Sequence, residues 1–265
     1  MNASVLKRII GEPDGKSCIS IRLIFSPDGT YLLCFGDFKD VSTSKVSMMV
    51  AVLACDTKNP GASSVIVLWT SPSHSFSEAL WISDSMIATV DSRSSTTFIY
   101  RLDKDAKEIR AEAKFDCGVG GAKSLTLVQN SKPRVTIATL CDAGFLQLIE
   151  IELGRRKRSR DGAPKESDLV VRPIAAAYDP KFFHVDAISF RRSGSSNLLF
   201  GVSRRYQQVF GWVQQTQRQT WELFLSHRIL LRDDGLRTKA PLMIHAVSDR
   251  RLVVVFDEHC LTLAL

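Results

Sequence analysis

The chain has 265 residues, of which 45% are hydrophobic and 24% are charged, and its formal net charge is +7. This composition predicts a globular protein and excludes an intrinsically disordered or collagen-like chain. No apolar run approaches the roughly 18 residues that a membrane-spanning helix needs, and residues 1–10 lack the long apolar stretch of a secretory signal, so we expect an intracellular protein without membrane insertion.

Cysteine usage agrees with an intracellular location. The six cysteines are scattered, form no CxxC pair and have no metal-ligand spacing. We therefore expect reduced thiols, most of them buried in strands. They are Cys18, Cys34, Cys55, Cys117, Cys141 and Cys260.

Short apolar runs rich in β-branched and aromatic residues predict strands, because their period is two residues instead of the 3.6 of a helix. Helical stretches of normal length are almost absent. In chain order, the expected strands are residues 19–25, 31–35, 46–54, 64–69, 78–82, 86–90, 96–102, 109–115, 124–128, 134–140, 145–153, 169–176, 185–190, 198–202, 208–213, 221–229, 243–247, 252–256 and 260–265. Many short strands separated by turns predict a sandwich, a barrel or a propeller.

An internal repeat decides among these three architectures. Residues 21–33 form an apolar strand, a polar turn and a second apolar strand, and residues 185–200 repeat this pattern. Weaker copies occur in the regions 79–88, 125–138 and 244–255, which makes five units. The positions that we treat as equivalent are Phe25, Trp81, Leu127, Phe190 and Val247.

The first unit contains Phe25-Ser26-Pro27-Asp28-Gly29, which resembles the turn between the first two strands of a blade in the WD-repeat β-propeller family. The resemblance implies an all-β propeller of about five four-stranded antiparallel blades, forming a single domain over residues 1–265. The chain has no Gly-His pair and no Trp-Asp pair, so the hydrogen-bonded His and Asp of typical blades are not expected here.

Four blades are expected from residues 19–69, 78–115, 124–176 and 185–229, and residues 243–265 supply three further strands. Residues 4–10 could provide the fourth strand of this last blade and close the ring by pairing the termini. The alternative is an open or truncated propeller.

The most basic segment, within residues 154–168, is expected to be an exposed loop. It contains Arg155, Arg156, Lys157, Arg158 and Arg160. Clustered Lys and Arg serve as nuclear-import signals or as phosphate contacts, although a solvated loop without a role remains open. Smaller pairs occur at expected turns, at residues 191–192, 204–205 and 250–251.

Aromatic residues are the other candidates for partner binding. Most tryptophans are expected to pack between blades, but Trp212 and Trp221 flank the polar segment 214–220. This position makes them the best candidates for exposed binding anchors.

No catalytic, metal or cofactor site is predicted. The five histidines form no HxH or HxxxH pair, and the chain has no Gly-x-Ser-x-Gly elbow. The glycines at 118–121 lack phosphate-loop spacing, so a linker between blades is the better interpretation.

These features predict a non-catalytic protein–protein interaction scaffold, because a propeller presents rigid turns without needing catalytic residues. Its partners would be other subunits of a larger assembly. The basic loop favours the nucleus, where family analogy suggests ribosome-biogenesis, nuclear-pore or chromatin complexes. Two alternatives remain: RNA or DNA binding through the basic loops, and a propeller enzyme.

Overall fold

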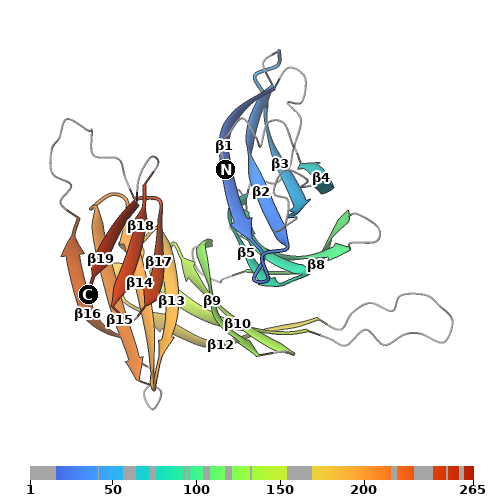
Figure 1. Cartoon of the computed structure of the whole chain (residues 1–265). Helices are drawn as coiled ribbons and strands as arrows, with labels where there is room; N and C mark the ends of the chain where they lie inside the picture. Colours follow the sequence, from blue (N-terminus) through green and yellow to red (C-terminus); the bar gives the residue numbers. More distant parts are fainter. Residues whose placement is uncertain are drawn as a thin grey trace, which may run out of the picture. The chain divides into compact units, whose positions relative to one another are not determined.

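The computed structural model describes residues 16–40, 42–55, 64–71, 76–91, 94, 96–103, 108–116, 121–131, 133–153, 169–215, 220–229, 241–248, 250–256 and 260–265. The chain divides into two compact units, unit 1 up to Phe115 and unit 2 from Asp116 onward. Every sheet consists of strands that follow one another in the chain and are hydrogen-bonded neighbours (Figure 1). This order is that of propeller blades.

Unit 1 contains two four-stranded sheets. The first comprises β1 (Lys16–Phe25), β2 (Tyr31–Asp40), β3 (Val46–Ala54) and β4 (Ser64–Ser71). The second comprises β5 (Phe76–Ser83), β6 (Met86–Asp91), β7 (Thr96–Asp103) and β8 (Glu108–Asp116).

Unit 2 contains two four-stranded sheets and one three-stranded sheet. The first comprises β9 (Ala122–Ser131), β10 (Arg134–Cys141), β11 (Phe145–Glu152) and β12 (Val170–Tyr178), which a short 3₁₀ helix, η2 (Pro180–His184), follows. The second comprises β13 (Ala187–Ser193), β14 (Ser196–Ser203), β15 (Gln208–Gln215) and β16 (Glu222–Arg228), and the third comprises β17 (Met243–Ser248), β18 (Arg251–Val255) and β19 (Cys260–Ala264).

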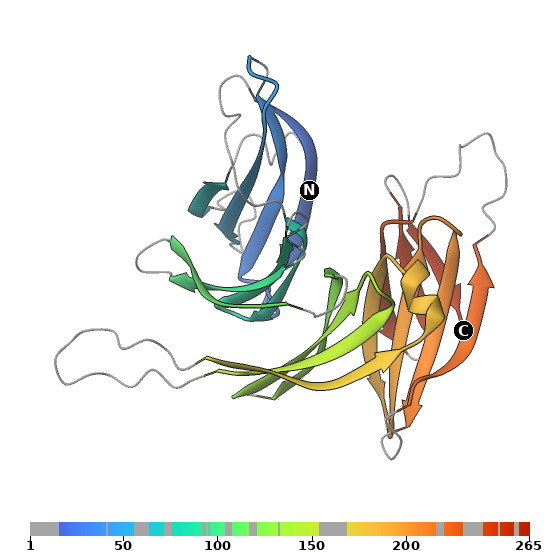
Figure 2. The same ribbon diagram turned by 180° about the vertical axis from the view of Figure 1, so that it is seen from behind.

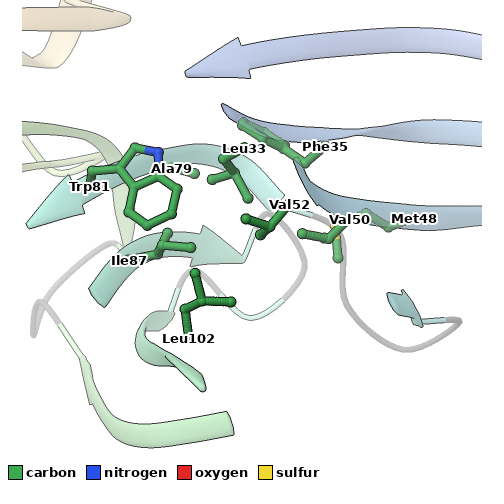
Figure 3. Close-up of a cluster of buried hydrophobic side chains, with 9 residues drawn as sticks. All are labelled: Leu33, Phe35, Met48, Val50, Val52, Ala79, Trp81, Ile87 and Leu102. Atoms are coloured by element: carbon green, nitrogen blue, oxygen red, sulfur yellow. The ribbon is translucent and has the colours of Figure 1, made fainter. Parts of the chain in front are cut away.

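Apolar side chains fill the space between neighbouring sheets of each unit. The strand β6 is buried along its whole length, as expected for an inner strand of a blade that is covered on both faces. In unit 1 the core cluster joins both sheets (Figure 3) and comprises Leu33, Phe35, Met48, Val50, Val52, Ala79, Trp81, Ile87 and Leu102. In unit 2, one cluster joins the first two sheets and another joins the second and third.

The first strands of neighbouring sheets in unit 2 are also linked by hydrogen bonds from backbone to side chain. The backbone N–H of Ile188 donates to Ser124 Oγ at 3.1 Å, and that of Phe190 donates to Thr126 Oγ1 at 3.2 Å. In the same way, the N–H of Ala246 donates to Ser189 Oγ at 3.1 Å. The two bonds between β9 and β13 advance together along both strands, which shows that these strands run in the same direction.

The structure confirms the all-β fold class and the five sequence repeats, each of which forms one sheet. Each of the 19 expected strands corresponds to one strand of the described chain, with bounds shifted by a few residues. Phe25 and Phe190 both lie on the first strand of their sheet. Sequence patterns did not predict η2. The proposed closing strand at residues 4–10 and the glycine-rich linker at 118–120 lie outside the described residues.

The described part of the chain contains no helix with the length and apolarity needed to cross a bilayer.

Candidate docking surface

Exposed aromatic rings gather on the turns at one end of the unit 2 strands. Phe145 is 37% exposed, Tyr178 61%, Phe183 61% and Tyr206 41%, and His184 is also exposed. We call these five residues the aromatic turn surface. Large apolar side chains are usually buried, so their exposure in one region is informative.

The helix η2 positions Phe183 and His184, and Figure 2 shows it against the β13–β16 sheet. Its N-cap is Asp179, whose Oδ1 accepts a hydrogen bond from the Lys181 N–H at 2.8 Å. The neighbouring Phe182 is fully buried, with its ring centroid 4.6 Å from that of Trp212. Burial of Phe182 directs the next two side chains to the surface.

The turn between β10 and β11 lies against η2. Gly144 has φ +79°, and a Cβ atom at this position would lie 3.3 Å from the backbone nitrogen of Phe183. Glycine is therefore suited to this position, because it adopts a positive φ without strain and has no Cβ atom to collide with η2. The next residue, Phe145, stacks at a tilt on Tyr178, with ring centroids 5.1 Å apart.

The turn between β14 and β15 supplies the last aromatic ring and a cation. Asp186 Oδ2 accepts the Arg204 N–H at 2.7 Å, and Ser203 Oγ accepts the Tyr206 N–H at 3.3 Å. The Tyr206 ring meets His184 edge to face at 4.9 Å. The guanidinium of Arg205 lies 5.6 Å from the centroid of the same ring, within cation–π range.

One partly buried lysine stabilises the backbone below these rings. Lys123 Nζ donates a hydrogen bond to the carbonyl oxygen of Phe183 at 3.1 Å. Burial lowers the pKa of Lys123, and the nearby carboxylates of Asp142 and Asp186 oppose this effect. The lysine is therefore held by the backbone of the turn, whereas His184 and Arg205 are exposed to solvent.

The aromatic turn surface presents rings to solvent, with the guanidinium of Arg205 at its edge. Rigid aromatic rings and an arginine are the residue types that contribute most binding energy at protein interfaces. Among the described residues, no group of three or more His, Cys, Asp and Glu side chains could hold a metal ion.

The structure corrects one predicted anchor, Trp212, and shows the other, Trp221, to be partly accessible. Trp212 is not an exposed anchor, because its side chain is fully buried and its Nε1 donates to Asp179 Oδ2 at 2.9 Å. Trp221 is half-buried and meets the Phe190 ring edge to face at 6.5 Å. Neither belongs to the aromatic turn surface. The predicted basic residues Arg155, Arg156, Lys157, Arg158 and Arg160 lie outside the described residues.

Sequence patterns missed the aromatic turn surface because its members come from three separate turns. Two features of the sequence could have indicated this surface. Asp179-Pro180 begins a short helix that ends with consecutive aromatic residues, and Arg205-Tyr206 occupies a turn where polar residues are usual.

No family model matches the chain, and no curated protein matches it. Among solved structures, a protein from Lactobacillus plantarum aligns with 92% of this chain and 66% of its own, at 12% identity and a TM-score of 0.56. The WD40 domain of SCAP from fission yeast aligns with 93% of this chain and 51% of its own, at 8% identity and a TM-score of 0.50. A putative 6-phosphogluconolactonase from Bacteroides uniformis gives 12% identity, 91% and 69% coverage, and a TM-score of 0.46.

The fold thus defines a β-propeller-class protein with similarity to a WD40 domain. At these identities the likeness concerns the fold alone. The chain spans about half to two thirds of the length of the first two proteins.

Proposed function

We propose that this protein is a degenerate WD-repeat propeller that acts as a protein–protein interaction scaffold in a larger assembly. The observation that carries the proposal is the aromatic turn surface, whose exposed rings are held by a short helix, a tight glycine turn and hydrogen-bonded turns. A rigid surface loses little conformational entropy on binding. Solvent-exposed aromatic rings contribute little to the stability of the chain, but in a fixed arrangement they can contribute to the binding of a partner.

We further propose that the protein is not an enzyme. The described groups with displaced pKa values have structural explanations. Hydrogen bonds within their own turns lower the pKa values of Asp28 and Asp40 to about 2. Burial raises the pKa of the Cys34 thiol to about 12, which makes this cysteine a poor nucleophile.

Affinity capture from native extract with the double variant Phe183→Ala/Tyr206→Ala tests the scaffold proposal. We expect wild type to retain a defined set of partners and the variant to lose it, because both substitutions remove interface rings. The matched control is Phe224→Ala, which removes an aromatic ring that is 50% exposed on another strand, β16. Equal capture by all three proteins would contradict the assignment of this surface.

We propose a nuclear location, with ribosome-biogenesis, nuclear-pore and chromatin complexes as candidate assemblies. The basic segment around Arg155–Arg160 supports this proposal by its composition. Replacing its five Lys and Arg residues by Ala in a fluorescent fusion is expected to move the protein to the cytoplasm. Nuclear retention of this variant would contradict an import signal at this position.

A further inference from the structure

Two arginine-bearing hairpins lie side by side at the other end of the unit 2 strands. The strands β13 and β17 are neighbours (Figure 1), linked by the bond from the Ala246 N–H to Ser189 Oγ. Arg191 Nη1 also donates to the carbonyl oxygen of Val247 at 3.0 Å. The β13–β14 turn and the β17–β18 turn therefore project from the same end of the two sheets.

Each hairpin carries two consecutive arginines next to its turn. Arg191 and Arg192 precede the Ser193–Ser196 closing pair, and Arg250 and Arg251 end the second turn. Arg192, Arg250 and Arg251 are exposed. Among the described residues of the two hairpins, none is acidic; Asp249 lies outside the described residues. By sequence the two hairpins carry four arginines and one aspartate, so their formal charge is positive.

An aromatic side chain lies on the side of β13 that carries Arg192, which is opposite the side whose Arg191 bonds to Val247 of β17. Phe190 and Arg192 share one face of β13, because residues two apart on a strand point to the same side. Trp221, which immediately precedes β16, contacts the Phe190 ring and is only half-buried. Part of an indole is therefore accessible on the side of the sheet that carries Arg192.

We propose that Arg192, Arg250 and Arg251, with Trp221 on the Arg192 side of β13, bind a single-stranded nucleic acid that crosses the end of the β13–β14 hairpin. We call these four residues the arginine hairpin surface. Guanidinium groups pair bidentately with phosphate oxygens, and an accessible ring can stack on an unpaired base. Three exposed arginines at one end of the strands fit a polyanion, and the chain as a whole carries +7. The exposed Glu222, which follows Trp221, is the described acidic residue next to this surface.

This surface is separate from the aromatic turn surface. The β13 strand spans seven residues between the two ends, which corresponds to about 20 Å at about 3.3 Å per residue. The proposal of nucleic-acid binding and the proposal of protein binding by the aromatic turn surface can therefore be tested independently.

The test measures binding of a fluorescein-labelled 20-nucleotide oligo(U) by fluorescence anisotropy over a range of salt concentrations. In the variant Arg192→Ala/Arg250→Ala/Arg251→Ala we expect affinity to fall at least about tenfold, and the slope of log K against log salt to shrink by about 0.7 for each lost phosphate contact. Arg191 is left unchanged because its side chain bonds to the backbone of the neighbouring hairpin. The corresponding triple Lys variant should keep the salt slope.

Single-arginine controls use arginines elsewhere in the chain. Arg205→Ala lies at the opposite end of unit 2, and Arg110→Ala removes an exposed arginine in unit 1 that pairs with Glu108. Both variants should bind like wild type. Trp221→Leu should weaken binding by about fivefold or more without changing the salt slope, because stacking involves no counterion release.

Several results would overturn the proposal. Wild-type affinity in the triple Ala variant would do so, as would loss of binding only when the five basic residues of 155–160 are replaced. Competition by poly-glutamate as effective as that by unlabelled oligo(U) would identify an acidic protein as the partner instead. An unchanged affinity of Trp221→Leu would contradict base stacking. Oligo(dT) in place of oligo(U) distinguishes RNA from DNA.

Discussion

The indole of Trp212 holds η2 through two contacts, packing on Phe182 and a hydrogen bond to Asp179. Both partners are needed to present the aromatic turn surface. Asp179 uses its other carboxylate oxygen to cap η2, so this one carboxylate links the helix to the β13–β16 sheet. A buried tryptophan thus supports a binding surface that it does not itself reach.

Replacement of Trp212 by Phe should lower the free energy of unfolding by about 1–3 kcal/mol, because it removes the N–H donor of the Asp179 carboxylate and leaves a space in the core. Urea unfolding followed by circular dichroism measures the change. The control is Trp221→Phe, at a half-buried ring without a described hydrogen bond of this kind. Equal effects of the two substitutions would show that the bond to Asp179 contributes nothing.

The Pro27-Asp28-Gly29 turn makes a prediction about acid stability. Asp28 accepts bonds from the hydroxyls of Ser26 at 2.6 Å and Thr30 at 2.7 Å, and these bonds lower its pKa from 3.8 to about 2. Because the pKa is lower in the folded chain, the stabilisation is complete above about pH 4 and is lost as the pH falls toward 2. Asp28→Asn should therefore show a weaker loss of stability than wild type between pH 4 and pH 2.

Urea midpoints measured at several pH values check this difference. Asp40 adds a similar effect, because Ser42 and Thr43 donate hydrogen bonds to its carboxylate. Asp28→Asn should therefore retain part of the loss of stability between pH 4 and pH 2. The additional substitution Asp40→Asn should remove that remaining part. Parallel pH profiles of wild type and Asp28→Asn would contradict the role of the turn.

At the scale of elements, hydroxyl groups on the first strands align neighbouring blades. Ser124 is fully buried, and its Oγ accepts the Ile188 N–H. Ser124→Ala leaves this buried donor without a partner and should cost about 1–3 kcal/mol. The control is Ser131→Ala on the same strand, where the side chain is exposed and its hydroxyl accepts a hydrogen bond from the nearby Gln129 Nε2.

Hydrogen exchange provides a more specific measurement for the same variant. The Ile188 amide should exchange faster in Ser124→Ala than in wild type, whereas amides in the β14–β15 pairing should exchange as before. Unchanged protection of Ile188 would mean that another acceptor replaces the serine.

The strands were predictable because their signal is local. A two-residue alternation and turn residues such as Asp28-Gly29 act within a few positions of the chain. The η2 helix was not predicted because it comprises only five residues. It also depends on the packing of Phe182 against Trp212, which is far away in the sequence. The same distance explains the mistaken choice of Trp212 as an exposed anchor.

At the scale of the molecule, unit 2 presents two chemically different ends on the same set of strands. Aromatic rings occupy the end with η2, and arginines occupy the end with the β13–β14 and β17–β18 turns. Because the ends are about 20 Å apart along β13, we expect additive behaviour of substitutions at the two ends.

A protein that combines Phe183→Ala/Tyr206→Ala with the triple Arg→Ala variant tests this expectation. Protein capture should follow the aromatic substitutions alone, and oligonucleotide affinity should follow the arginine substitutions alone. Loss of both activities from either set of substitutions would indicate one continuous interface, or a common loss of folding that circular dichroism would detect.

The sequence by itself determined the all-β class, the five repeated units and the positions of the strands, because periodicity and turn chemistry are properties of neighbouring residues. It also located the paired arginines. Only the tertiary structure decided which turns share an end, which tryptophan is buried, and that Phe145, Phe183 and Tyr206 come together. The physical reason is that such surfaces arise from the packing of blades, in which residues far apart in the chain become neighbours.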